Sequence, residues 1–163
     1  MNQFDRSVRI QNALRQGFAD GSAKMAQRKC YGYQIDADGS LAINDSEAEI
    51  VCWIFQLYLT GSSLGQIVDE LGKRHVLSPT GKDKWNREAL QKLLKNEKYV
   101  GDVLLQKTVS LGHAYQMKNN GCEARYLYQN HHPAIIDREI YEAVQKRMAE
   151  RAKTSSLSLA GCF

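Results

Sequence analysis

The chain has 163 residues, 43% of them hydrophobic, and a formal net charge of +4, which suits one globular domain with a real core. No apolar run reaches the ~18 residues of a membrane span, and the polar N-terminus lacks the apolar segment of a signal peptide, so we expect a cytoplasmic protein. The four cysteines, Cys30, Cys52, Cys122 and Cys162, form no C-x-x-C pair, which argues against a zinc ribbon, and a disulfide framework is not expected.

The N-terminal part is predicted to be a helix over residues 5–25 that carries Arg6, Arg9 and Arg15. A basic connector, residues 24–29, follows it. Two short strands, 31–35 and 41–43, flank a turn. Asn44 is then a helix N-cap, with Glu47 placed to complete a capping box, and Gly61 ends that helix.

The next segment has the pattern of a helix, a turn and a second helix. Ser63 and Gln66 can form a capping box, Leu64, Ile67, Val68 and Leu71 form one apolar face, and Gly72 is a plausible stop. The turn, residues 78–85, contains Pro79 and Gly81, which forbid regular helix. Asn86 is a good N-cap for the second helix, whose buried face is expected to be Ala89, Leu90, Leu93 and Leu94.

Positive charge gathers in this segment. From Lys73 to Lys98 there are eight Lys and Arg residues against three acids, a local charge of +5. A helix-turn-helix with a basic second helix is the arrangement that places a helix in the DNA major groove. From charge and periodicity alone, a solvated Lys-rich helical hairpin in an ordinary domain explains the pattern equally well.

The C-terminal third is predicted to contain strands over 99–107 and 126–136, and then a helix that Asp137 caps and that runs to about Arg151. Residues 154–163 are Ser-rich and are expected to be a disordered tail or the start of a further segment. The fold class is therefore α+β, mostly helical, with a winged-helix-like helix-turn-helix unit and a small antiparallel sheet.

Three ordered blocks resemble a known family. The blocks are 47–61 (Glu-Ala-Glu-Ile-Val to Gly61), 93–107 (Leu-Leu-Lys-Asn-Glu-Lys-Tyr-Val-Gly-Asp-Val onward) and 132–144 (His-Pro-Ala-Ile-Ile onward). Together with Tyr31-Gly32-Tyr33 they resemble the recombinase domain of the large serine recombinases, the integrases and transposon-type resolvases of phages and mobile elements. The resemblance covers about residues 31–151.

That resemblance implies a modular parent protein. It implies an N-terminal catalytic domain with a serine nucleophile, a long helix, this DNA-binding domain, and a zinc ribbon with a coiled-coil insertion. We therefore expect residues 1–29 to be the linker helix and connector, 30–153 the DNA-binding domain, and 154–163 a tail or the start of the ribbon. Zinc is expected only in that downstream ribbon, where Cys162 is either a first ligand or a chance cysteine, and no cofactor is expected in this chain.

The residues offer no catalytic centre of their own. Ser62, Ser63, Ser78 and Ser110 have no His and acid arranged around them in sequence, and His131-His132 suits packing better than metal ligation. Asp36, Asp38 and Asp45 lack the glutamate of an EF-hand loop. We expect no enzyme activity from this chain.

The predicted function is binding of a double-stranded DNA attachment site, to position a catalytic domain for integration or excision, with other recombinase subunits met through domains outside this chain. Arg87, Gln91, Lys92 and Lys95 are predicted to face the major groove, with Ser78, Thr80, Lys82 and Lys84 on phosphates. The resemblance implies minor-groove or phosphate contact for Arg15, Lys24, Arg28 and Lys29. Trp85 is expected to pack under the turn as core. A stand-alone winged-helix transcription regulator and a protein-interaction module of a recombination complex remain alternatives.

Overall fold

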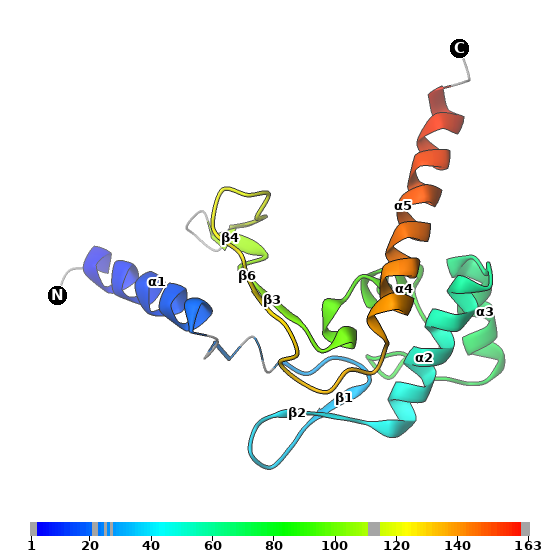
Figure 1. The fold of residues 1–163 in the computed structure, drawn as a ribbon, viewed down its shortest axis with the longest axis horizontal. Coiled ribbons are helices and arrows are strands. Elements are labelled where there is room, and N and C mark those ends of the chain that lie inside the picture. Colours follow the sequence, from blue (N-terminus) through cyan, green and yellow to red (C-terminus); the bar gives the residue numbers. More distant parts are fainter. Residues whose placement is uncertain (1–2, 21–22, 25, 27, 111–114, 161–163) are drawn as a thin grey trace.

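The computed structural model describes residues 3–20, 23, 24, 26, 28–110 and 115–160, the side chains of 3–8, 11, 110 and 155–160 excepted. A lobe of helices and a lobe of short strands lie side by side along the long axis, with one helix at the N-terminal end (Figure 1). The elements in order are α1 (Gln3–Ala19), β1 (Tyr33–Ile35), β2 (Leu41–Ile43), α2 (Asp45–Leu59), α3 (Leu64–Lys73), α4 (Arg87–Leu94), the 3-10 helix η1 (Glu97–Val100), β3 (Val103–Leu105), β4 (Thr108–Ser110), β5 (Gln116–Lys118), β6 (Tyr126–Tyr128) and α5 (Arg138–Ala160). The α+β class is confirmed.

The described strands form three separate two-stranded antiparallel ladders rather than one sheet. They are β1–β2, β3–β6 and β4–β5. The predicted strand over 99–107 is wrong at its start, because Tyr99 lies in η1 and Gly101 then turns the chain with a φ of +81°. The predicted strand over 126–136 is wrong beyond Tyr128, because the backbone amides of Ile135 and Ile136 donate to the carbonyl of Tyr99 instead of to a neighbouring strand.

The core lies among α2, α3, α4 and α5, where the apolar residues of each helix face inward. Its fully buried side chains include Phe55 of α2, Leu71 of α3, Leu90 of α4 and Val144 of α5. The capping box predicted for Ser63 and Gln66 is confirmed, with both of its hydrogen bonds present. Gly72 does not end α3, which continues to Lys73, so the stop comes one residue later than predicted.

The start of α2 is tied to the β1–β2 hairpin. Asn44 caps the helix as predicted, since its side chain accepts from the backbone N–H of Glu47. The carboxylate of Glu47, however, accepts from the backbone N–H of Gly32 at 2.8 Å rather than closing a box on Asn44. The backbone amide of Asn44 donates to the carbonyl of Gly32, so two hydrogen bonds hold the two segments together.

The helix α5 is longer than predicted. It runs to Ala160, nine residues beyond Arg151, so residues 154–160 are helical and not the disordered tail that was one of two expectations. It packs on α2, where the guanidinium of Arg147 donates to the carbonyl of Leu59, which the end of that helix leaves without a helical partner. The guanidinium of Arg151 donates to the carbonyls of Gly61 and Ser62, between α2 and α3, and lies over the ring of Tyr58. Cys162 lies outside the described residues.

The helix α1 ends at Ala19 rather than near Met25, so the predicted helix is too long. The side chains of Phe18 and Ala26 pack against Val103 and Leu105 in a second, smaller apolar cluster. The hydroxyl of Tyr128 donates to the carbonyl of Phe18 at 2.6 Å. The N-terminal segment is thereby attached to the strand lobe and not to the helical core.

A buried histidine joins the strand lobe to the helical core. His132 packs edge-on against the ring of Tyr33, and its Nε2 lies 2.7 Å from the carbonyl oxygen of Lys98. Burial lowers the pKa of His132 below its ordinary value of 6.5. The neutral imidazole is therefore the form that this packing accommodates.

The free energy of unfolding should fall as the pH falls below about 6.5, because the unfolded chain then binds a proton that the folded chain resists. We expect the melting temperature to drop between pH 7 and pH 5, and the drop to shrink in His132→Gln. His75→Gln, at an exposed position, serves as the control. An unchanged pH profile in His132→Gln would contradict this account.

Candidate nucleic-acid interface

The helix pair α3–α4 is built as a helix-turn-helix with a long turn. The side chain of Asn86 caps α4 by accepting from the backbone N–H of Glu88, as predicted. Trp85 is only 2% exposed, and its indole N–H donates to the carbonyl of Val76 at 3.0 Å. The expectation that Trp85 packs as core is confirmed, and the buried indole fixes where the turn enters α4.

The outer face of α4 is polar and basic. Leu90, Leu93 and Leu94 are buried, while the four residues predicted to face the groove are exposed: Arg87, Gln91, Lys92 and Lys95. Lys92 pairs with Glu88 at 2.9 Å, an exposed contact that carries little stability. Because Glu88 is the only acid on α4, this face stays net positive.

The side chain of Arg87, unlike those of Gln91, Lys92 and Lys95, lies against the neighbouring helix α3. A Cβ placed on Gly65 of α3 would lie 3.0 Å from the Nη2 atom of Arg87, so the guanidinium lies across the first turn of α3. The glycine supplies the space that this arrangement needs. The periodicity of α4 shows that Arg87 is outward but cannot show this contact, because Gly65 belongs to another helix.

The turn before α4 is ordered by its own hydroxyl groups. The Oγ of Ser78 accepts from the backbone N–H of Lys82 at 3.0 Å and lies 3.2 Å from the Oγ1 of Thr80. The amides of Ser78 and Gly81 complete the loop by donating to the carbonyls of Lys82 and Ser78. Ser78 and Thr80, predicted to touch phosphates, thus shape the turn, and the side chains of Lys82 and Lys84 are exposed at its surface.

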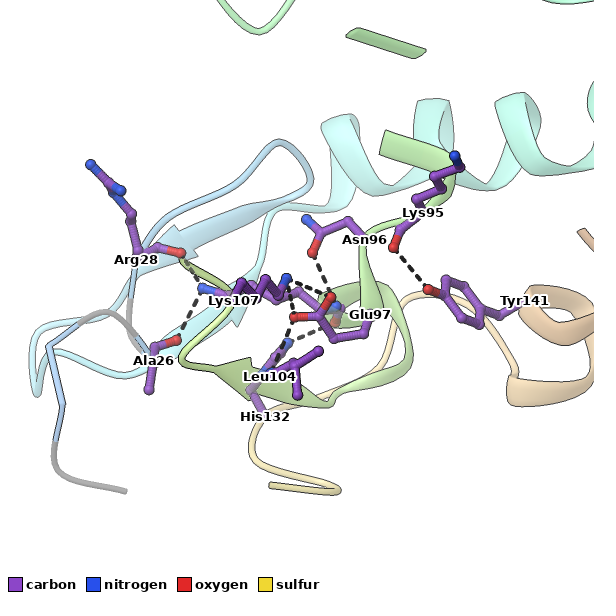
Figure 2. Close-up of polar contacts among 10 residues, drawn as sticks. Ala26, Arg28, Lys95, Asn96, Glu97, Leu104, Lys107, His132 and Tyr141 are labelled. Atoms are coloured by element: carbon purple, nitrogen blue, oxygen red, sulfur yellow. Dashed lines mark hydrogen bonds and ion pairs between the residues drawn. The ribbon is translucent and has the colours of Figure 1, made fainter. Parts of the chain in front are cut away.

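The connector is anchored to the domain by a lysine that the site prediction did not include. The Nζ of Lys98 donates to the carbonyls of Ala26 and Arg28 at 3.0 and 2.6 Å. Burial lowers the pKa of Lys98. Figure 2 shows the carbonyl of Arg28 turned inward while its side chain extends away, and Lys24 and Lys29 are exposed as well.

Beside the connector lies a cavity of about 480 Å³, lined by cations, by two glutamates and by apolar side chains. Arg15, Arg28, Lys29 and Lys107 line it, so the structure brings together three of the four N-terminal cations of the prediction, all but Lys24. Arg15 pairs with Glu123 at 3.1 Å and Lys107 with Glu97 at 2.7 Å (Figure 2 shows the second pair). Sequence reasoning could not find these pairings, because Arg15 and Glu123 are 108 residues apart.

No group of three or more His, Cys, Asp or Glu side chains suited to a metal ion occurs among the described residues. Within the same part of the chain, no helix is long and apolar enough to cross a membrane. Ser63 is the N-cap of α3 and Ser78 belongs to the turn, as expected for serines with structural roles. The outer surface of α4 and of the turn before it thus consists of basic and amide side chains on a packed helical frame, which suits binding to a polyanion.

Comparison with known proteins agrees with this geometry. A family model described as Recombinase matches residues 45–151. A solved structure titled "Crystal Structure of a LSR-DNA Complex" is similar at 22% identity with a TM-score of 0.50, covering 77% of this chain and 32% of that one. Another, from a study of the sequence requirements of the Listeria innocua prophage attP site, is 21% identical with a TM-score of 0.48 and covers 74% and 42%.

This chain therefore spans less than half of the length of either solved chain. The structural likeness supports the fold, and the family match, which covers most of the chain, supports membership. The match begins at residue 45, so the Tyr31-Gly32-Tyr33 block lies outside it, while the blocks at 47–61, 93–107 and 132–144 lie inside. The resemblance found in the sequence is confirmed, and the chain belongs to the Recombinase family.

Proposed function

We propose that this chain is a DNA-binding domain of a large serine recombinase that recognises an attachment site and positions a catalytic domain on it. The observation that carries the proposal is the outer face of α4, where Arg87, Gln91, Lys92 and Lys95 are exposed above a fully packed inner face. A helix presented in this way can enter the major groove. Family membership and the fold of the DNA-complex neighbour support the same reading.

The residues divide by role according to how the structure holds them. Gln91 stands near the middle of α4 and can pair with the edge of an adenine, and Arg87 suits a guanine. Lys82 and Lys84 on the turn suit phosphates, and Lys24, Arg28 and Lys29 on the connector suit phosphates or the minor groove, because these exposed cations lie outside the helix that faces the major groove. Arg15 acts at the edge of this surface, since Glu123 already pairs with it.

The salt dependence of DNA binding tests the proposed phosphate contacts. With about six phosphate contacts, a plot of log affinity against log salt concentration should have a slope of roughly −5 on the attachment-site duplex. The slope is obtained from fluorescence anisotropy titrations at salt concentrations between about 50 and 300 mM. A flat response would remove the proposed phosphate contacts.

Single substitutions should distinguish the side chains that read bases from those that only contact phosphates. Gln91→Ala or Arg87→Ala should cost about 1–3 kcal/mol on the correct site and relax sequence preference, because base contacts are lost. Lys82→Ala should weaken correct and scrambled duplexes about equally. All three side chains are exposed, so the melting temperature should stay close to that of the parent chain. If Lys82→Ala proved the more sequence-specific loss, the roles of turn and helix would be reversed.

The chain alone should cleave no DNA. Incubation with supercoiled plasmid carrying the attachment site, with and without Mg²⁺, should leave the plasmid supercoiled and give only a non-covalent gel shift. Ser63 caps α3 and Ser78 shapes the turn before α4, and neither is hydrogen-bonded to a histidine or a carboxylate among the described residues. A covalent adduct that survives denaturation and is lost when one serine becomes Ala would identify a nucleophile within this chain.

A further inference from the structure

We propose that the ladders β3–β6 and β4–β5, with residues 119–125 that join them, form a second DNA-contact element, which contacts a phosphate backbone through Lys118 and Arg125. This inference rests on the proposed function, because it assumes a duplex already held by α4. It adds a surface that none of the sequence-predicted residues belongs to. The argument combines the rigidity of this segment, its charge and its position.

The segment forms one bent β-ribbon. The ladder β3–β6 leads into the ladder β4–β5. Between them, the backbone N–H of Asn119 donates to the carbonyl of Lys107. Gln106 marks the bend on one strand with a φ of +62°. Residues 119–125 form the bend on the other strand, so the outer ladder extends away from the packed part of the domain (Figure 1).

A buried asparagine makes the bend rigid. Asn119 is 2% exposed, and its amide nitrogen donates to the carbonyls of Gln106 and Glu123, both at 2.8 Å. Its Oδ1 accepts from the backbone N–H groups of Gly121 and Glu123. A two-stranded hairpin is marginally stable in isolation. These four hydrogen bonds hold the outer ladder in a fixed direction although little apolar packing supports it.

The ribbon presents unbalanced positive charge. Its acid, Glu123, is paired with Arg15, and Lys107 is paired with Glu97. Lys118 and Arg125 are both exposed and form no ion pair among the described residues. By register, Thr108 lies opposite Lys118, and Gln116 is on the same face of the ladder two residues before Lys118, so a hydroxyl and an amide group accompany Lys118. Lys, Thr and Gln are residues that bind phosphate oxygens.

The ribbon also lies next to cations already assigned to DNA. Thr108, Val109 and Gln116 form one wall of the 480 Å³ cavity, and Arg28 and Lys29 form another. The ribbon and the connector therefore line the same cavity, and Lys118 and Arg125 lie on the ribbon outside this lining. Figure 1 shows the outer ladder at a distance from α4 along the long axis, toward α1. A duplex bound by α4 and by Lys118 and Arg125 on the ribbon would be contacted over a longer stretch than one helix can cover.

The test compares Lys118→Ala/Arg125→Ala with the parent chain by salt-dependent anisotropy and hydroxyl-radical footprinting on the attachment-site duplex. Loss of two phosphate contacts should reduce the magnitude of the log–log slope by about 2. It should weaken correct and scrambled duplexes equally and shorten the protected region at one end. The charge-retaining variant Lys118→Arg/Arg125→Lys should keep the parent slope and footprint.

Two controls separate the outcomes. Lys146→Ala on α5 removes an exposed cation away from the ribbon and should leave the slope unchanged, and the melting temperatures of all variants should match, since the substituted side chains are exposed. A parent-like slope and footprint in Lys118→Ala/Arg125→Ala would overturn the inference while leaving α4 binding intact. Absence of any duplex binding by the parent chain would instead overturn the proposed function itself.

Discussion

The arrangement of the parts of the molecule depends on a close approach of two chain segments at Gly101. A Cβ at this position would lie 2.5 Å from the carbonyl oxygen of His132, so only glycine fits, and the φ of +81° favours glycine as well. The close approach lets the carbonyl of Gly101 accept from the amides of His131 and His132. Next to Gly101, the buried carboxylate of Asp102 accepts two hydrogen bonds from Arg138 at the start of α5. These contacts hold the pKa of the Asp102 carboxyl below its usual value.

The segment before Gly101 extends this junction to the N-terminal region. Lys98 holds the connector through two backbone carbonyls, and Glu97 accepts from the amide of Leu104 and from Lys107. The hydroxyls of Tyr33 and Tyr99 donate to carbonyls of Lys98 and Tyr31. The connector, the start of the β-ribbon and the start of α5 are thus each bound to residues 97–102. These residues follow α4 closely in the chain, so one short segment links the helix to the three other parts.

The sequence predicts a hydrogen bond correctly where the two partner residues lie within one helical turn of each other. The capping box of Ser63 and Gln66 and the cap of Asn86 are short-range arrangements, and both were predicted. Glu47 was misread because its partner, Gly32, lies in the preceding hairpin, 15 residues away. The end of the last helix was predicted too early, near Arg151, because Ser-rich composition lowers helix propensity only modestly and an established helix can extend through it.

The same limit applies to the candidate interface. Exposure of Gln91, Lys92 and Lys95 follows from the period of α4, since the leucines must face the core. The contact of Arg87 with Gly65 and the pairing of Arg15 with Glu123 follow from tertiary packing, which no periodicity reveals. Cations that tertiary packing leaves without acidic partners are the ones able to exchange counterions for phosphates. A net charge of only +4 is therefore compatible with strong binding to DNA, because the number of unpaired cations on one face matters more than the total charge of the chain.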